Sequence, residues 1–345
     1  MQSAVDWLES LSPWPEEFGL ERMQRLLAEL GDPQRRYPSI HVVGTKGKST
    51  ATRTIAELLR AEGLRVGAYT SPHVSGWHER LDTDPATLVR ALERVRPHAD
   101  GATQFEVLTA AALAEFAAEG VDAAVVEAGL GGRLDATNTI DTRVVHLTNV
   151  GLEHTSVLGD TREAIAREKL AVATPEAIVV LGEPEWTGLV PGTDVRLGGA
   201  RETAEAFLGR SVEHEVDVRL PGRFERRGNE IWDGAHTLDA AGWLLERLDR
   251  DDYVLCVSIL EDKDVNAILA RLREAGEVLV ATQSSNPRSL ATKELAARAE
   301  PYFEHVEPIA DPVAALGRAR ELARPAGAVL VTGSLYLLAD LYVAG

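Results

Sequence analysis

The stretch Gly44-Thr45-Lys46-Gly47-Lys48-Ser49-Thr50 decides the fold. A short, mostly β-branched run at 40–43 precedes it, and residues 51–60 follow with apolar side chains at helical spacing. The glycines therefore lie where a strand turns into a helix, and unpaired backbone N–H groups and the helix dipole favour an anion there. Lys48 can reach the outer oxygens of a phosphate, and one of the two hydroxyls after it can face a magnesium ion.

The alternative for this stretch is an ordinary tight turn with a solvated lysine. Gly-Lys-Ser alone fits both interpretations, but a strand before it and a helix after it favour nucleotide binding. The loop is two residues shorter than the common Gly-x4-Gly-Lys-Ser/Thr pattern.

Composition limits the class of protein. The chain has 345 residues, 45% of them hydrophobic, which suffices for two domains with substantial cores. No stretch approaches the ~20 apolar residues of a membrane span, and residues 1–6 lack the basic and apolar regions of a signal peptide. The net charge of −18 argues against nucleic-acid binding. The single cysteine, Cys256, lies in a predicted buried strand and is interpreted as a core thiol. A cytoplasmic protein is expected.

Strands and helices alternate along the chain, which favours an α/β fold with a doubly wound, mostly parallel sheet. The pattern occurs twice and predicts an N-terminal phosphate-loop domain over 1–217 and a smaller Rossmann-like domain over 218–345. Helices are expected in 1–36 (with a break) and at 85–95, 105–119, 161–172, 236–248, 265–275, 292–299 and 312–323; strands are expected at 66–70, 121–127, 144–147, 177–181, near 231, and at 253–259, 277–282 and 328–333. Residues 182–214 lack strong periodicity and are expected to be weakly structured or a short elaboration.

Ligands of such sheets bind at the carboxyl ends of the strands, where Ser71, Glu127 and His154 are expected. Glu127 ends an apolar strand and precedes a glycine-rich loop. A metal beside the phosphates would offset the cost of burying its carboxylate, and a hydrogen bond to a neighbouring turn is the alternative. Without further context, His154 fits a structural histidine and Lys169 fits a surface charge.

Two stretches of the second half differ from their flanks, namely 221–225 and 232–236. Asp233 and His236 bracket a turn into a predicted helix, so a capping role is an alternative for them. Residues 260–264 fit a solvated loop, and 332–336 fit a closing strand and turn.

Together these stretches resemble the folylpolyglutamate synthase/dihydrofolate synthase family of the Mur ligase superfamily. The match covers most of the chain and keeps the family's order. The short phosphate loop resembles the superfamily's loop, and 127–138 is the most specific match. The other matching stretches are 71–73, 79–81, 105–109, 151–169, 221–225, 233–236, 262–264 and 333–336.

The resemblance implies an ATP-dependent amide ligase. A pterin or folate carboxylate would be phosphorylated to an acyl phosphate, and the amine of glutamate would attack it. The implied partners are the pterin or folate acid, glutamate, ATP and Mg²⁺, with two metal sites, and no nucleic acid or membrane. A monomer is also implied, with a cleft completed by domain closure that excludes water.

The resemblance also assigns roles to single residues. Lys48, His154 and Lys169 would be catalytic, with Lys169 matching a lysine that is carbamylated in the family. The metal ligands would be Ser71, Glu127, His154 and Lys169. ATP would contact Gly44, Thr45, Gly47, Lys48, Ser49, Thr50, Arg223, Asp233 and His236. The pterin would be surrounded by Gly19, Leu20, Thr103, Gln104, Phe105, Glu106, Leu134, Asp135 and Ala136.

The sequence departs from the family's pattern at several positions. Lys46 replaces asparagine, Ser49-Thr50 is closer to the Mur branch, Glu153 replaces aspartate and Thr237 replaces asparagine. The chain is also short between Lys169 and Pro221. These departures leave two alternatives open: a Mur-type or other amide ligase with a different acid acceptor, and a diverged, non-catalytic ATP-binding protein.

Overall fold

The computed structural model describes residues 2–190, 194–323 and 327–344, and the chain in it forms two compact units. The first unit comprises Met1–His73 and Trp77–Val218, and the second comprises Val74–Gly76 and Arg219–Gly345. The segment 74–76 thus belongs to the second unit although it lies within the sequence of the first. The predicted division between residues 217 and 218 assigns this segment to the first domain, because its composition does not distinguish it from its neighbours.

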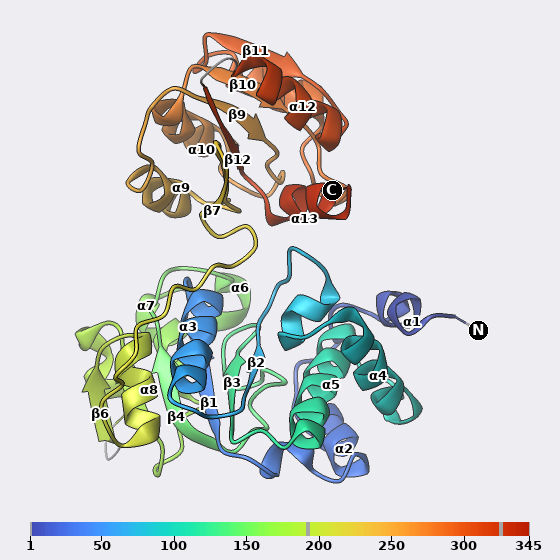
Figure 1. Ribbon diagram of the computed structural model, residues 1–345, viewed down its shortest axis with the longest axis vertical. Helices are drawn as coiled ribbons and strands as arrows, with labels where there is room; N and C mark the ends of the chain where they lie inside the picture. Colours follow the sequence, from blue (N-terminus) through green and yellow to red (C-terminus); the bar gives the residue numbers. More distant parts are fainter. Residues whose placement is uncertain (1, 191–193, 324–326, 345) are drawn as a thin grey trace. The chain divides into compact units, whose positions relative to one another are not determined.

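The first unit is built on a six-stranded parallel sheet with the order β2-β3-β1-β4-β5-β6 (Figure 1). This confirms the predicted parallel α/β class. The strands are β1 Ser39–Val43, β2 Val66–Tyr69, β3 Ala123–Glu127, β4 Thr142–Leu147, β5 Ile178–Leu181 and β6 Asp194–Leu197.

Helices cover both faces of this sheet, which explains why its strands are continuously apolar. Along β3, Ala123 and Val125 pack beneath α3 (Lys48–Ala61) and α8 (Ala200–Leu208), whereas Ala124 and Val126 face the opposite cluster. The remaining helices of this unit are α1 Ala4–Ser10, α2 Glu21–Glu29, η1 Pro33–Arg35, η2 Trp77–Leu81, α4 Pro85–Val95, η3 Arg96–His98, α5 Gln104–Glu119, α6 Thr155–Leu158, α7 Arg162–Leu170 and η4 Pro184–Leu189.

Of the two alternatives expected for 182–214, weak structure is wrong for the described residues, and a short elaboration fits them; 191–193 lie outside the described residues. This stretch contains η4, β6 and α8. β6 extends the sheet by pairing with β5, and α8 packs on α3 and on β4. The strand was missed because β6 is an edge strand with mostly exposed side chains, so it lacks an apolar run.

The second unit has a mixed, mostly parallel sheet in the order β11-β10-β9-β12-β8-β7, in which only β7 is antiparallel to its neighbour among the described strands. Its strands are β7 Glu225–Arg227, β8 Glu230–Trp232, β9 Tyr253–Val257, β10 Val278–Ala281, β11 His305–Pro308 and β12 Ala328–Thr332. Its helices are α9 Leu238–Leu245, α10 Val265–Leu272, η5 Arg273–Ala275, α11 Thr292–Ala299, α12 Pro312–Leu322 and α13 Leu335–Ala344.

Two edge strands and the last helix of this unit were not predicted. β7 and β11 are short, and most of their side chains are at least partly exposed, so neither gives an apolar run. The predicted closing strand and turn at 332–336 is also corrected, because β12 ends at Thr332 and α13 begins at Leu335. Cys256 is fully buried in β9, and burial raises the pKa of its thiol to about 12, which confirms a core thiol.

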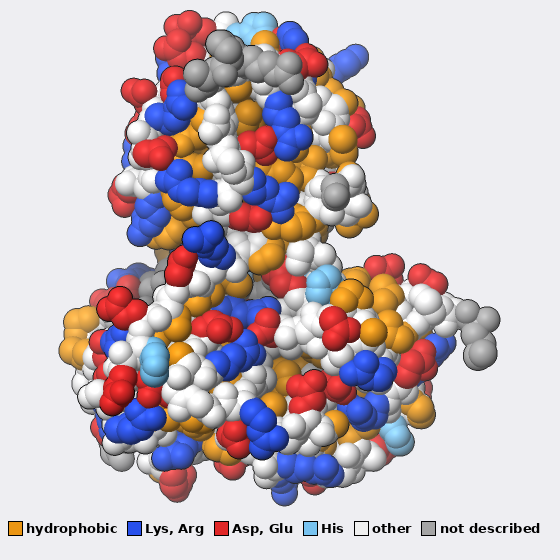
Figure 2. Space-filling model, viewed as in Figure 1, with side chains coloured by type: hydrophobic (Ala, Val, Ile, Leu, Met, Phe, Trp, Pro, Cys, Tyr) orange, Lys and Arg blue, Asp and Glu red, His pale blue; other side chains and the backbone are white. Residues whose placement is uncertain are grey.

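The surface carries both signs of charge. Acidic and basic side chains are interspersed on the face shown in Figure 2. None of the helices within the described residues has both the length and the apolar character needed to cross a membrane.

Two histidines in the first sheet make stability depend on pH. Burial lowers the pKa of His41 in β1 to about 3 and that of His146 in β4 to about 4. The unfolded chain binds protons to histidine near pH 6.5, so below this value it holds more protons than the folded chain. The free energy of unfolding should therefore fall as the pH falls from about 6.5 towards 4, by about 1.4 kcal/mol per pH unit for each histidine.

Urea titrations across this pH range measure the effect. His146→Leu should reduce the slope of unfolding free energy against pH by about one proton. Leu147→Ala, which creates a cavity in the same strand without removing a titrating group, is the matched control. Equal slopes for wild type and His146→Leu would contradict the argument.

Candidate active site

The phosphate loop forms the turn between β1 and α3, as predicted. β1 ends at Val43 and α3 begins at Lys48. Gly44 and Gly47 have φ values of 147° and 76°, which glycine adopts without strain. A Cβ on Gly44 would collide with the hydroxyl of Thr148, so a larger residue would push the loop away from the end of β4.

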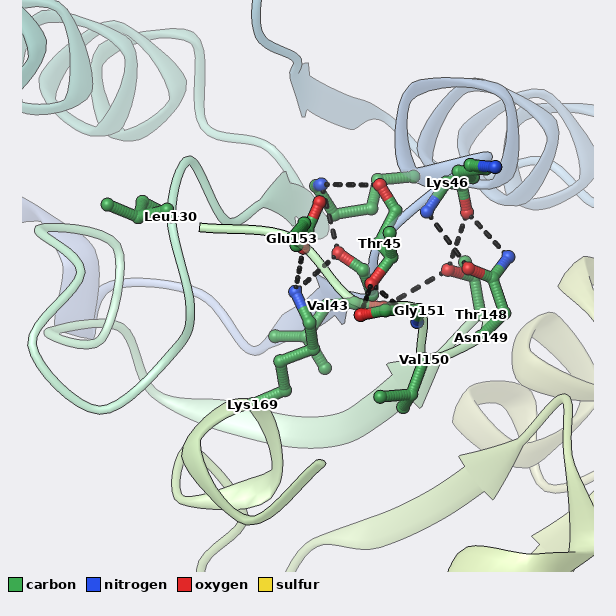
Figure 3. Close-up of polar contacts among 12 residues, drawn as sticks. Val43, Thr45, Lys46, Leu130, Thr148, Asn149, Val150, Gly151, Glu153 and Lys169 are labelled. Carbon is green, nitrogen blue, oxygen red and sulfur yellow. Dashed lines mark hydrogen bonds and ion pairs between the residues drawn. The ribbon is translucent and has the colours of Figure 1, made fainter. Parts of the chain in front are cut away.

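The segment after β4 holds the backbone of this loop (Figure 3). The Asn149 side chain accepts a hydrogen bond from the Lys46 N–H (3.0 Å) and donates one to the Lys46 carbonyl (2.9 Å). The Thr148 hydroxyl donates to the same carbonyl (2.8 Å), and the Thr45 hydroxyl accepts from the Gly151 N–H (3.0 Å). The protein itself therefore fixes the loop, which lowers the cost of ordering it around a ligand.

Lys48 reaches back over the loop from the first turn of α3. Its ammonium donates to the Gly44 carbonyl (3.0 Å) and lies 3.5 Å from the Thr45 carbonyl. The first N–H groups of a helix have no intrahelical partner, and the N-cap Gly47 has no side chain to satisfy them. A phosphate at this point would meet the helix dipole and the Lys48 ammonium together.

Glu127 ends β3 beside the phosphate loop. Glu127 is only 2% exposed, and its carboxylate accepts from the Ser49 hydroxyl (3.1 Å) and from the Ser71 N–H (2.9 Å). Hydrogen bonding to neighbouring segments, the alternative interpretation, is therefore present. The oxygen donors also fit Mg²⁺, which favours carboxylates alongside phosphate oxygens and water.

Across the described part of the chain, no group of three or more His, Cys, Asp or Glu side chains is arranged to hold a metal ion. A magnesium ion next to Glu127 would therefore need further oxygen ligands from a nucleotide, from water or from hydroxyl groups.

Lys169 lies in the protein interior, which rules out the surface-charge interpretation. Its side chain is 1% exposed, and its ammonium is 2.6 Å from the Glu153 carboxylate and 2.8 Å from the Gly44 carbonyl (Figure 3). Burial and the nearby Lys48 charge lower the pKa of Lys169, while Glu153 acts in the opposite direction. Lys169 lies on α7, so its ammonium links this helix to the segment after β4 through Glu153 and to the phosphate loop through Gly44.

His154 is exposed at the start of α6, with φ at 44°. Its imidazole has no hydrogen-bond partner among the described residues, so no contact of its side chain joins it to Glu127 or Ser71. Its neighbour Glu153 reaches Lys169 instead. A metal-binding role for His154 stays a prediction.

The acceptor residues predicted at the start of α5 already have partners within the protein. Thr103 caps the helix, and its N–H (2.8 Å) and hydroxyl (2.9 Å) donate to the buried Glu106 carboxylate. Arg22 Nε donates to the same carboxylate (3.1 Å), and the Gln104 amide donates to the Leu8 carbonyl (3.2 Å). This end of α5 is therefore rigidly held.

Gly19 and Leu20 immediately precede α2, which carries Arg22. Arg22 Nη2 also donates to the Glu17 carbonyl (3.0 Å), so the segment before α2 is tied to Glu106 and thus to α5. The structure therefore joins two of the three stretches predicted around the acceptor. Arg22 was not predicted to matter, and its only signal is a cation three residues after Gly19.

The third predicted stretch lies in the loop after β3. Leu134 is 44% exposed, whereas Asp135 and Ala136 are buried. Phe105 lies against this loop, because a Cβ on Gly129 would come within 2.6 Å of its ring. Burial raises the pKa of Asp135.

The three predicted residues of the second unit also share one location. The Asp233 carboxylate accepts from the N–H groups of residues 224 (2.7 Å) and 235 (2.9 Å), and burial raises its pKa. The His236 Nδ1–H donates to the Gly234 carbonyl (2.7 Å), and burial lowers the pKa of His236. Gly234 in turn donates to the carbonyl of residue 222, next to Arg223.

The helix-capping alternative for Asp233 and His236 is wrong. α9 begins at Leu238, and the Thr237 hydroxyl accepts from the N–H of Ala240 (3.3 Å), so Thr237 is the cap. Asp233 instead holds a turn at the carboxyl end of β8.

Two family models match the chain. The Mur ligase middle domain matches residues 42–183, and the Mur ligase, glutamate ligase domain, matches 222–335.

Curated relatives match over most of the chain. A dihydrofolate synthase/folylpolyglutamate synthase of Mycobacterium tuberculosis is 31% identical over 84% of this chain and 80% of its own length. A probable bifunctional folylpolyglutamate synthase/dihydropteroate synthase of Haloferax volcanii is 34% identical over 98% of this chain. The chain spans about half the length of that relative (49%).

Solved structures match both units. Mycobacterium tuberculosis folylpolyglutamate synthase complexed with ADP has a TM-score of 0.85 at 28% identity, covering 99% of this chain and 97% of that one. Escherichia coli FolC in complex with DHPP and ADP has a TM-score of 0.84 at 28% identity, covering 99% and 97%. The bifunctional enzyme of Yersinia pestis complexed with AMPPNP and Mn ion has a TM-score of 0.82 at 27% identity, covering 100% and 99%.

Gly132 tests how closely the loop after β3 must approach α7. A Cβ on Gly132 would lie 2.6 Å from the Lys169 carbonyl oxygen and 2.8 Å from that of Glu168. Gly132→Ala should lower the free energy of unfolding by about 1–3 kcal/mol, because backbone atoms must move apart. Gly188→Ala is the control, since its Cβ would have no neighbour within 4 Å. Equal urea midpoints for the two variants would contradict the close approach.

Proposed function

The chain belongs to the dihydrofolate synthase/folylpolyglutamate synthase family of Mur ligases, and we propose that it joins L-glutamate to dihydropteroate, to folates or to both, at the expense of ATP. One observation carries this proposal: Lys48, Glu127 and the buried Lys169 gather around the phosphate loop of a chain that matches these ligases over nearly its whole length.

The proposed reaction has two steps. The acceptor carboxylate attacks the γ-phosphorus of ATP, so that ADP leaves and an acyl phosphate forms. The amine of glutamate then attacks the acyl carbon. The tetrahedral intermediate expels phosphate, the nitrogen loses a proton, and the amide remains.

The phosphate loop serves the first step in this proposal. The helix end and the Lys48 ammonium offset the charge that spreads over the transferring phosphoryl group. Ser49 and Glu127 would hold Mg²⁺, which when bound supplies further neutralisation of phosphate charge. The Yersinia pestis complex with AMPPNP and Mn supports a divalent metal here.

We assign Lys169 to a carbamate. A neutral amine adds to CO₂ and releases a proton, and burial favours the neutral amine by lowering the pKa of Lys169. The product is an anion beside Glu153, so a cation must accompany it. A magnesium ion held by Ser71, Glu127, His154 and the carbamate would meet this need.

Dihydropteroate is the first acceptor to test. The Haloferax volcanii relative is named a probable bifunctional folylpolyglutamate synthase/dihydropteroate synthase, and dihydropteroate is one of the two acids of the proposed reaction. The predicted acceptor residues at 19–20, 103–106 and 134–136 lie in tightly held segments, which suits recognition of a rigid pterin ring.

In this proposal the two domains have different roles. Residues 1–217 would bind ATP and 218–345 would act as the ligase domain, in line with the family models that match each part. Contacts of Arg223, Asp233 and His236 with ATP stay predictions, as do a monomeric state and a cytoplasmic location.

A coupled phosphate-release assay tests the function. With ATP, Mg²⁺ and glutamate present, release should depend on both glutamate and an acid, and dihydropteroate and tetrahydrofolate are compared as that acid. Lys48→Ala should abolish turnover, because the phosphate charge loses its main partner; near-normal activity would refute the loop assignment. Release with neither acid, from folded protein that binds ATP, would favour another acceptor or a non-catalytic protein.

The carbamate has its own test. Lys169→Ala should lower turnover by at least about 100-fold, since a buried charged group and its contacts are lost. A small carboxylate should restore part of the rate by replacing the carbamate anion. Wild-type protein in ¹³C-bicarbonate should show a carbamate resonance that is missing from Lys169→Ala, while exposed Lys293→Ala keeps it. A wild-type rate in Lys169→Ala would refute the role.

A further inference from the structure

A chain of three buried polar side chains runs from β1 to the loop after β3. His41 Nε2 lies 2.8 Å from the Thr137 hydroxyl oxygen. That hydroxyl donates to Asp135 Oδ1 (2.5 Å), which also accepts from the Thr137 N–H (3.0 Å). The second oxygen, Oδ2, accepts from the Leu130 N–H (2.7 Å). His41 and Thr137 are completely buried, and Asp135 is 6% exposed.

The direction of each hydrogen bond in this chain follows from chemistry. The Thr137 hydroxyl has one proton, which it donates to Asp135, so it accepts from His41. His41 must therefore carry its proton on Nε2. Its Nδ1 is buried with no hydrogen-bond partner among the described residues, so the bond to Thr137 is the one side-chain hydrogen bond that orients the ring there.

The hydrogen bonds to Asp135 close the loop 129–137 on itself. Asp135 accepts from Leu130 near the start of the loop and from Thr137 near its end, so one carboxylate sets the distance between them. Leu134 is exposed between these two anchors. The position of Leu134 and Ala136 therefore depends on a carboxylate that His41 and Thr137 orient.

The loop also has a defined place beside the candidate active site. It follows directly from Glu127, and His41 lies on the strand that ends in the phosphate loop. A Cβ on Gly129 would meet both the Phe105 ring (2.6 Å) and the Asp135 carboxylate (3.1 Å), so both side chains lie against this glycine. The hydrogen bonds from His41 through Thr137 to Asp135 thus connect the strand before the phosphate loop to the residues predicted around the acceptor.

We propose that His41 and Thr137 are positioning residues for the acceptor acid: they orient Asp135 and hold the loop 129–137 in the shape that receives it. The proposal rests on the proposed function for the identity of that acid. It predicts a specific kinetic effect: substitutions at Thr137 should weaken acceptor binding more than ATP binding, because Asp135 and Thr137 lie in the loop after β3 and not in the phosphate loop.

Thr137→Val and Thr137→Ser form the decisive pair. Valine has the shape of threonine but neither donates nor accepts, so it leaves His41 and Asp135 without their shared partner. Thr137→Val should raise the KM for the acceptor by about 10-fold or more, with kcat and the KM for ATP changed by less than about 3-fold. Thr137→Ser, which keeps the hydroxyl, should stay within about 3-fold of wild type in all three.

A second pair keeps the test valid if Thr137→Val fails to fold. Glutamine can place its amide nitrogen near the position of His41 Nε2, whereas phenylalanine fills the space without a donor. His41→Gln should therefore resemble wild type more closely than His41→Phe in the KM for the acceptor. Equal effects of the two substitutions, or a rise in the KM for ATP as large as that for the acceptor, would overturn the proposal.

Hydrogen exchange separates this proposal from the proposed function. In protein without substrates, the peptide covering 129–137 should exchange faster in Thr137→Val than in wild type or Thr137→Ser, because the Leu130 and Thr137 amides lose a fixed acceptor. If wild type releases no phosphate with either acid, the proposed function fails and the exchange comparison alone decides the loop-holding role. Equal exchange in all three proteins would overturn it.

Discussion

The phosphate-loop edge of the first unit depends on how one buried lysine, Lys169, is paired in its unmodified, positively charged form. An ammonium that is removed from water must be paired and hydrogen-bonded, or its desolvation opposes folding. Lys169 meets this requirement with the carboxylate of Glu153 and the carbonyl of Gly44. These partners come from the segment after β4 and from the phosphate loop, while Lys169 belongs to α7. The cost of burying the charge therefore forces three separate segments to meet at one point.

The same edge of the sheet satisfies other polar groups in a similar way. Glu127 accepts from the hydroxyl of Ser49 and from the N–H of Ser71, so each of these segments is fixed to the end of β3. Parallel strands bring their carboxyl ends together, and loops of different origin then supply each other's hydrogen-bond partners. A site assembled in this manner is rigid without being hydrophobic, which suits the handling of phosphate.

Much of this arrangement could be predicted from the sequence. Apolar runs that end in a polar residue, as in 123–127, mark both a central strand and the edge where ligands bind. Edge strands such as β6 and β11 could not be predicted, because strands with exposed side chains lack the apolar runs that mark strands in the interior. The hydrogen-bond partners of a polar side chain could not be predicted from the sequence either. Lys169 looked like a surface charge, because its burial depends on Glu153 and Gly44, which the fold brings to it. The hydrogen bonds that link His41, Thr137 and Asp135 could not be predicted for the same reason.

The segment 74–76 has a consequence for how the protein is made. Val74 is 1% exposed in the cluster of the second unit that contains Trp232, Leu337 and Leu338. The ribosome releases this valine before the other buried members of that cluster, and the next of them, Trp232, follows only after the rest of the first unit has been synthesised. The second unit therefore cannot complete its core from its own contiguous sequence. A gene fragment that begins at residue 219 encodes a protein with a hole where Val74 belongs, so the two units cannot be separated by a single cut in the chain.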